Sequence, residues 1–317
     1  MLFISAARRV ELIQCFRADA RQLGIELRVL AAEVRPDLSP ACHLADTSFA
    51  LPPSTAPEYL PLLLALCRQE KVDLLVPIMD GELALLSRAR AAFAALGVRV
   101  VVSAPEVVAL AADKFATAER LSAAGVPAPR TLRWEDYQRE PAQLRWPVIA
   151  KPNGGCASVG LVRPGRPEDL AGLRGQDYIV QELWQGREYT VNVFFDAGGR
   201  LRCAVPHWRV EVRAGEVGKG FTERVPALAD AAQKLAALLP GARGPLCFQA
   251  IVTDSGNCAV FEINARFGGG YPLAHRAGAR FSQWLLEELD GRPGTANDDW
   301  RAGVAMLRYD QSVFVDG

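Results

Sequence analysis

The segment VFEINARF, residues 260–267, carries the side chains best suited to chemistry in this chain. Side chains on an extended strand alternate between its two faces, so Glu262, Asn264 and Arg266 are expected to project together. Side chains on one face of a strand lie roughly 7 Å apart along it. A carboxylate, an amide oxygen and a guanidinium in one row is an unusual set on an otherwise apolar strand, and it indicates a binding site.

The preceding segment, LCFQAIVT at residues 246–253, is also strand-like, and DSGN supplies turn residues between the two. A hairpin that closes at Ser255-Gly256 places Gln249 opposite Glu262, about 5 Å away. Gln249, Glu262 and Asn264 then converge as oxygen donors of the type that magnesium prefers. The alternative is the solvated face of an ordinary hairpin, but the glycines at 268–270 are costly to keep without a function.

Magnesium in proteins usually has a phosphate partner, and residues 146–160 supply a candidate for holding one. WPVIAKP predicts a buried strand that ends near Lys151, and a loop of small residues follows it. Backbone N–H groups of such a loop can surround phosphate oxygens, and the candidates are Gly154, Gly155, Ser158 and Gly160. The spacing fits neither the Walker pattern nor a dinucleotide fingerprint, because a second strand is expected at Leu161-Val162. A plain hairpin remains the alternative.

Residues 177–195 predict two strands around a polar joint. Gln181 and Glu182 end the first strand, and Glu188 begins the second. An acid beside the apolar pair Leu183-Trp184 would bind ribose hydroxyls while backbone groups contact an adenine edge. The alternative is a surface glutamate beside a turn glycine.

The order of these segments resembles the ATP-grasp superfamily, and most closely the single-chain proteins related to a synthetase half of the carbamoyl-phosphate synthase large subunit. The resemblance covers nearly the whole chain, and its most specific part is the segment Glu-x-Asn-x-Arg-x-Gly-Gly-Gly. It implies that Lys114 and Lys151 contact nucleotide phosphates, that Glu182, Leu183 and Trp184 border adenine, and that Glu188 holds the ribose. It further implies that Gln249, Glu262 and Asn264 bind two magnesium ions, for which manganese can substitute, and that Arg266 contacts the transferred phosphoryl group.

One departure from the family pattern concerns the metal. Gln249 stands where many relatives have a carboxylate. The charge of the metal is then less fully neutralised, and we expect a lower affinity for magnesium.

The predicted fold class is α/β, with α+β character in the grasp region. Short apolar strands at 2–5, 27–33, 74–78 and 98–103 alternate with helical segments such as 10–23 and 59–70, which indicates a parallel sheet. We expect a Rossmann-like pre-ATP-grasp domain at 1–108, a lid or small subdomain at 109–183 and a catalytic subdomain at 184–317. A helix is expected at 228–239, and the tail segments MLRYD and SVFV are expected to form strands.

Two sets of charged residues stay ambiguous. Asp80 and Glu82 follow a predicted strand at the carboxyl edge of the sheet, where ligands bind, but acids also suit the first turn of a helix. Arg209, Glu211 and Arg213 share one face of a predicted strand and would bind a substrate anion or simply face solvent.

Composition sets broad limits. Lysine plus arginine (36) equals aspartate plus glutamate (36), so no overall charge favours nucleic acid or an acidic membrane surface. No apolar run reaches transmembrane length. Seven scattered cysteines without metal spacing indicate reduced thiols in a cytoplasmic protein, and three histidines make a catalytic triad or zinc site a poor candidate.

The resemblance implies an ATP-dependent carboxylate–amine ligase that forms an acyl-phosphate on a small metabolite or amino acid. Its partners would be small carboxylates and amines, and homodimers are common among relatives. Two alternatives stay open, namely phosphorylation of bicarbonate or carbamate and binding of ATP without turnover. The sequence does not identify the carboxylate or the amine.

Overall fold

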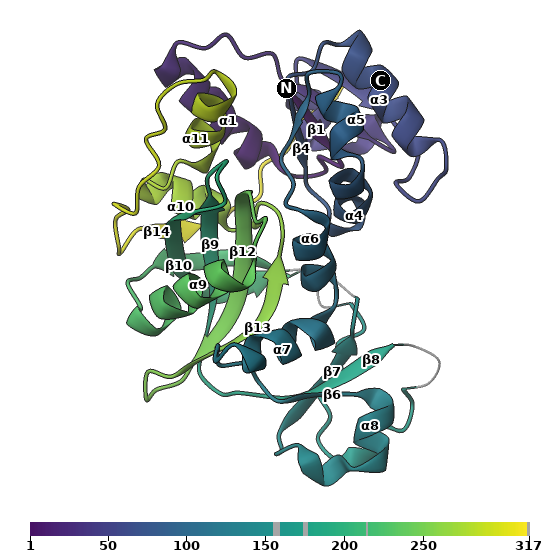
Figure 1. Cartoon of the computed structure of the whole chain (residues 1–317), viewed down its shortest axis with the longest axis vertical. Helices are drawn as coiled ribbons and strands as arrows, with labels where there is room; N and C mark the ends of the chain where they lie inside the picture. Colours follow the sequence, from purple (N-terminus) through teal and green to yellow (C-terminus); the bar gives the residue numbers. More distant parts are fainter. Residues whose placement is uncertain (155–158, 174–176, 214, 316–317) are drawn as a thin grey trace.

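The computed structural model describes residues 1–154, 159–173, 177–213 and 215–315 (Figure 1). Within these ranges the strands form three separate sheets of five, three and six strands. The parallel sheet lies at one end of the molecule and the three-stranded sheet at the other, with the six-stranded sheet between them (Figure 1). This is the predicted combination of a parallel N-terminal sheet with an antiparallel grasp region.

The five-stranded sheet is parallel throughout and has the order β3-β2-β1-β4-β5. Its strands are β1 (Leu2–Ile4), β2 (Leu30–Glu33), β3 (Thr47–Ala50), β4 (Leu74–Pro77) and β5 (Arg99–Val100). Four of them were expected. β3 was not, because only alternate residues of this edge strand are partly buried and it lacks an apolar run.

Helices surround this sheet as the alternation of the sequence predicts. They are α1 (Val10–Leu23), α2 (Pro40–Leu44), α3 (Tyr59–Gln69), α4 (Asp80–Arg88) and α5 (Arg90–Ala94), with a 3-10 turn η1 (Pro36–Leu38). Alternate residues of β1 enter different cores. Leu2 and Ile4 pack in the core that includes Leu63 of α3, and Phe3 packs in the core that includes Phe16 of α1.

Two helices, α6 (Pro105–Ala112) and α7 (Lys114–Ala123), connect the parallel sheet to the three-stranded sheet. That sheet is antiparallel, with the order β6-β8-β7. Its elements are β6 (Thr131–Arg133), β7 (Val148–Pro152), β8 (Tyr178–Glu182), α8 (Trp134–Arg139), η2 (Pro141–Gln143) and η3 (Pro167–Leu170). The strand expected at Leu161-Val162 is reduced to one bridge, between Ala150 and Val162.

The six-stranded sheet is antiparallel, with the order β13-β12-β9-β10-β11-β14. Its strands are β9 (Arg187–Phe195), β10 (Leu201–Arg213), β11 (Glu216–Thr222), β12 (Gly244–Val252), β13 (Cys258–Asn264) and β14 (Ala305–Leu307). The remaining helices are α9 (Pro226–Leu238), α10 (Tyr271–Ala277) and α11 (Phe281–Leu289). Of the two strands expected in the C-terminal tail, only the first forms in part, as β14, and residues 312–315 are in no strand.

A chain of aromatic rings fixes the parallel sheet against the six-stranded sheet. The ring of Phe16 on α1 lies 5.5 Å from Phe3 of β1 and 5.8 Å from Phe267, and Phe267 lies 4.8 Å from Tyr271 of α10. Edge-to-face packing of this kind adds to the burial of apolar surface. The start of α1 is therefore held beside the segment that follows β13.

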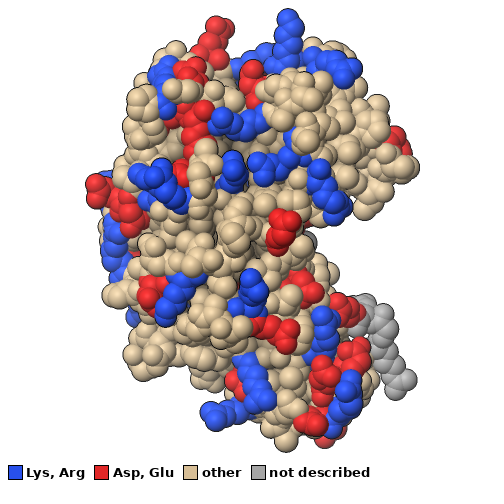
Figure 2. All heavy atoms as spheres, viewed as in Figure 1, with Lys and Arg blue, Asp and Glu red and all other residues tan. Residues whose placement is uncertain are grey.

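None of the described helices has both the length and the apolar character needed to cross a bilayer. Lysine and arginine side chains are interspersed with aspartate and glutamate over the face shown in Figure 2.

Candidate active site

A cleft of about 400 Å³ lies where the three sheets meet. Most of the residues singled out from the sequence line it: Lys114, Lys151, Gln181, Glu182, Leu183, Trp184, Glu188, Gln249, Glu262, Asn264 and Arg266. Gly154 and Gly160 are not among the lining residues, and Gly155 and Ser158 lie outside the described residues. Gly160 instead contacts its own sheet, where its carbonyl accepts a hydrogen bond of 2.9 Å from the Tyr178 hydroxyl.

The β12–β13 hairpin brings the three oxygen donors into the cleft. Gln249 lies opposite Glu262 as predicted, and Asn264 lies opposite Cys247. Between Gln249 and the turn, the pairing differs from the prediction by one residue. The difference arises because β13 has one extra residue, Phe261, at a bulge. The bulge also breaks strict alternation, so that Phe261 lines the cleft together with Glu262.

These donors fit a hard cation. A carboxylate and two amide oxygens are ligands that magnesium accepts, and it usually keeps water or phosphate in its other positions. Among the residues that the structure describes, no cluster of three or more histidine, cysteine, aspartate or glutamate side chains could hold a metal. A metal at this hairpin would therefore depend on the amide oxygens of Gln249 and Asn264.

Lys151 and Lys114 lie in the cleft near one another. Lys151 Nζ donates to Gln181 Oε1 at 3.0 Å and stands 5.2 Å from the centre of the Phe261 ring. The pKa of Lys151 is lowered to about 8, mainly by burial; Glu262 opposes this shift and Lys114 contributes to it. Lys114 follows the N-cap of α7, and its Nζ donates to the Asn153 carbonyl at 3.3 Å.

The joint between β8 and β9 forms another wall. Glu182 Oε1 accepts a hydrogen bond of 2.9 Å from the backbone N–H of Arg145, and the N–H of Leu183 donates to the Pro147 carbonyl at 2.8 Å. Trp184 lies beside them in the cleft lining. These contacts tie the joint to the segment before β7 and leave its apolar side chains facing the cleft.

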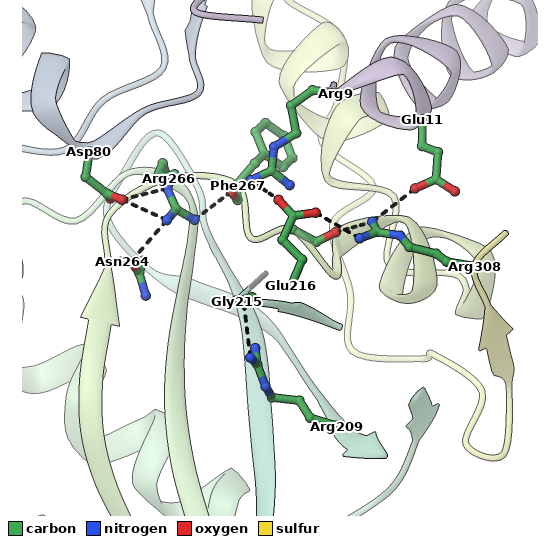
Figure 3. Close-up of polar contacts among 11 residues, drawn as sticks. Arg9, Glu11, Asp80, Arg209, Gly215, Glu216, Asn264, Arg266, Phe267 and Arg308 are labelled. Carbon is green, nitrogen blue, oxygen red and sulfur yellow. Dashed lines mark hydrogen bonds and ion pairs between the residues drawn. The ribbon is translucent and has the colours of Figure 1, made fainter. Parts of the chain in front are cut away.

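Arg266 lies in the cleft, although β13 ends at Asn264 and the prediction of a single strand face was wrong at this position. Its guanidinium is oriented instead by Asp80, with Nη2 2.8 Å from Asp80 Oδ2, and by Asn264 Oδ1 at 3.2 Å (Figure 3). Asp80 both begins α4 and lines the cleft, so both interpretations that the sequence left open for it are correct.

Glu82 does not reach the cleft. It is buried beneath the edge of the parallel sheet, where its Oε1 accepts hydrogen bonds from Ser5 and from Tyr59, the latter at 3.2 Å. Burial raises the pKa of Glu82 to about 7, although the two hydrogen bonds oppose the shift.

The expected common face of Arg209, Glu211 and Arg213 does not exist, because β10 has register shifts on both sides of Glu211. Arg209 alone lines the cleft, where its Nε lies 2.8 Å from Glu188 Oε1. Glu211 pairs with Lys219 at 2.6 Å, and Arg213 is exposed.

Sequence reasoning missed three charged residues in the cleft, Arg9, Arg163 and Glu216. Arg9 Nη2 lies 3.0 Å from Glu216 Oε1, and Arg308 holds the other carboxylate oxygen at 2.9 Å (Figure 3). The position of Arg9 was a usable signal, because it follows β1 at the carboxyl edge of a parallel sheet, where ligands bind. Glu216 gave no such signal, because no motif in the sequence around it indicates a site.

Comparisons with known proteins agree with this geometry. The family model described as ATP-grasp domain matches residues 111–270, about half of the chain, and the model described as PylC-like, N-terminal domain matches residues 1–101. A D-alanine–D-alanine ligase of Alcanivorax borkumensis is 34% identical over 106 residues, which are 31% of this chain and 34% of the ligase. The chain thus matches only about a third of that relative's length.

Solved structures share the fold at low sequence identity. Biotin carboxylase from Campylobacter jejuni has a TM-score of 0.74 at 16% identity, covering 95% of this chain and 73% of the carboxylase. L-amino acid ligase from Bacillus licheniformis has a TM-score of 0.71 at 17% identity, covering 95% and 77%. With the family model and the cleft in agreement, the chain belongs to the ATP-grasp family.

Proposed function

We propose that this chain is an ATP-dependent carboxylate–amine ligase that acts on a small metabolite or amino acid. The observation that carries the proposal is the single cleft, in which two lysines, an apolar joint, three oxygen donors and Arg266 come together from separate sheets. The names of the relatives support the same reaction class, since a D-alanine–D-alanine ligase and an L-amino acid ligase are among them.

The nucleotide would occupy the side of the cleft formed by β7, β8 and their joint. Lys114 and Lys151 would contact its phosphates. Glu182, Leu183 and Trp184 would border adenine, and Glu188 would hold the ribose. Gln181 and Glu182 would support this wall. The loop residues Gly154, Gly155, Ser158 and Gly160 remain candidates for backbone contacts to phosphate.

Gln249, Glu262 and Asn264 would hold magnesium, as two ions and with manganese as a substitute, and the metal would supply positive charge to the phosphates when bound. Arg266 would place a fixed guanidinium at the transferred phosphoryl group. Phosphoryl transfer requires mainly positioning and charge stabilisation from the protein, which is what these buried, hydrogen-bonded cations provide.

The reaction then follows in two steps. A carboxylate oxygen of the substrate attacks the γ-phosphorus, the bond from phosphorus to the ADP oxygen breaks, and an acyl-phosphate forms. The nitrogen of an amine attacks the acyl carbon, phosphate leaves, and the nitrogen loses a proton.

The proposal includes a cytoplasmic location and a homodimer. The buried free thiols of the described cysteines agree with a cytoplasmic location.

Release of ADP from ATP, measured over a panel of carboxylates with and without amines, tests this function. Glu262→Gln should lower the rate at least about 100-fold, because it removes the one carboxylate among the three oxygen donors. Glu211→Gln, which breaks an ion pair outside the cleft lining, should leave the rate unchanged. ADP release with bicarbonate alone would favour the carbamoyl-phosphate-type alternative, and nucleotide binding without any turnover would favour a binding protein.

A further inference from the structure

Two ion pairs line the cleft beside Gly269 and Gly270. Arg266 pairs with Asp80 at 2.8 Å, and Arg9 pairs with Glu216 at 3.0 Å (Figure 3). We call these four residues the paired-charge end of the cleft. The proposed nucleotide contacts involve only Arg266 of this set, which leaves Arg9 and Glu216 without a role.

We propose that the paired-charge end binds a zwitterionic α-amino acid, with Arg9 contacting its carboxylate and Glu216 its ammonium group. This inference rests on the proposed ligase function and deepens it, because it names the substrate class and two residues that select for it.

Arg9 is held in place by the fold. It immediately precedes α1, and Phe16 of that helix packs on Phe267 beside the cleft. Its Nη1 would lie only 2.9 Å from a Cβ atom added at Gly269, so the guanidinium rests directly against that backbone. An arginine has five N–H donors, and the ion pair with Glu216 engages one terminal nitrogen. Donors therefore remain for a carboxylate in the cleft.

Glu216 is anchored independently of Arg9. Arg308 Nη1 donates to Glu216 Oε2 at 2.9 Å, while its Nη2 donates to the Gly269 carbonyl at 2.6 Å and to Glu11 Oε2 at 3.0 Å. Burial acts to raise the pKa of Glu216, but the charges of Arg9 and Arg308 outweigh it and hold the carboxyl below its usual range. The carboxylate thus stays ionised and fixed when Arg9 also contacts a ligand.

The charge pattern selects for a ligand with both signs. Two guanidinium groups and two carboxylates sum to zero, so a simple anion would gain from Arg9 and Arg266 but be repelled by Asp80 and Glu216. A zwitterion presents one charge to each partner of the Arg9–Glu216 pair. Like-charge repulsion from Arg266 and Arg308 also contributes, after burial, to lowering the pKa of Arg9, and an added carboxylate would relieve that repulsion.

The test measures ADP release by the full chain with ATP, magnesium and the common protein amino acids, D-alanine and bicarbonate. For the best amino acid, the deaminated acid and the decarboxylated amine are compared with it. Arg9→Gln should raise the KM for the amino acid about 10- to 100-fold, the range for a lost charged hydrogen bond, with the KM for ATP unchanged. Arg9→Lys should recover part of the loss. Glu216→Gln should raise the KM for the amino acid but not for the deaminated acid.

Arg8→Gln is the matched control, because Arg8 is the exposed neighbour, does not line the cleft and acts on Glu216 only through its charge. An equal effect of Arg8→Gln, an unchanged KM in Arg9→Gln, or a preference for bicarbonate or the deaminated acid would overturn the inference. Calorimetric binding of MgADP shows that each variant is folded and separates the two proposals. If the wild type binds MgADP but no amino acid drives ADP release or raises the Tm, the amino-acid inference fails; if MgADP does not bind, the ligase function itself fails.

Discussion

The guanidinium of Arg266 and the carboxylate of Asp80 meet across 186 positions of sequence, with Nη2 2.8 Å from Oδ2. Asp80 starts a helix of the parallel sheet's domain, and Arg266 follows the last long strand of the antiparallel sheet. Arg266, which is expected to contact the transferred phosphoryl group, therefore follows a strand of the antiparallel sheet but is oriented by a helix of the other domain.

Asp80→Asn should lower kcat about 10- to 100-fold, because Arg266 loses the charged partner that orients it. The KM for ATP should change little, since Asp80 lies outside the proposed nucleotide contacts. Steady-state ADP release checks this. Asp37→Asn removes an exposed ion pair with Arg35 on the same domain and should leave kcat unaltered. A rise in the KM for ATP at constant kcat would show that Asp80 supports nucleotide binding instead.

Trp184 should report nucleotide binding. Its indole lines the cleft next to Leu183, so stacking of an adenine nearby should change its fluorescence. Titration with MgADP should alter the emission of the wild type, and Trp184→Phe should abolish the change and weaken binding severalfold. Trp134→Phe serves as control, because Trp134 stacks on Tyr137 away from the cleft lining. A persistent signal in Trp184→Phe would place the adenine elsewhere.

Local patterns in the sequence were sufficient to predict the site hairpin. Alternating residues and the glycine-containing turn paired Gln249 with Glu262 correctly, and the apolar periodicity gave the bounds of α1 without error. The prediction succeeded because both features depend on contacts between residues close in sequence. The pairing of Gln249 with Glu262 was predicted correctly although the turn was not, because the extra residue at the bulge, Phe261, offsets the one-residue error at the turn.

Contacts between distant segments could not be predicted in this way. The Arg9–Glu216 pair joins the residue just before α1 to the start of β11, and no periodicity of either segment indicates the other. Asp80 was recognised as a candidate only because the carboxyl edge of a parallel sheet is a usual place for ligands. The same rule applies to Arg9, which follows β1 at that edge but was not singled out from the sequence.

Gly270→Ala should destabilise the fold by about 1–3 kcal/mol, the usual cost of overpacking a core. A Cβ atom at this position would lie 2.5 Å from Nε2 of His207, which is fully buried in β10. Urea unfolding gives the measurement. Gly81→Ala provides the contrast, since a Cβ there meets nothing within 4 Å and Gly81 lies in α4; it should stabilise by up to about 1 kcal/mol.

The buried carboxyl of Glu82 should make stability depend on pH in a defined range. Its pKa is about 7 in the folded protein, against an ordinary value of 4.5 for a glutamate carboxyl. Between pH 4.5 and 7 the folded chain keeps a proton that the unfolded chain has released, so the contribution of Glu82 to stability falls as pH rises. The full loss is at most about 3 kcal/mol, at 1.36 kcal/mol for each pKa unit.

The difference between wild type and Glu82→Gln isolates this effect. Burial lowers the pKa of His207 to about 3, so His207 favours the folded state increasingly as pH rises toward 6.5 and opposes Glu82 in the wild-type profile. That contribution is common to both proteins and cancels in the difference. An amide at position 82 keeps an acceptor for Ser5 and Tyr59 but does not titrate. The free energy of unfolding of Glu82→Gln minus that of the wild type, both measured in urea, should therefore increase steadily from pH 4.5 to 7. A constant difference would show that the Glu82 carboxyl is ionised in the folded protein throughout that range.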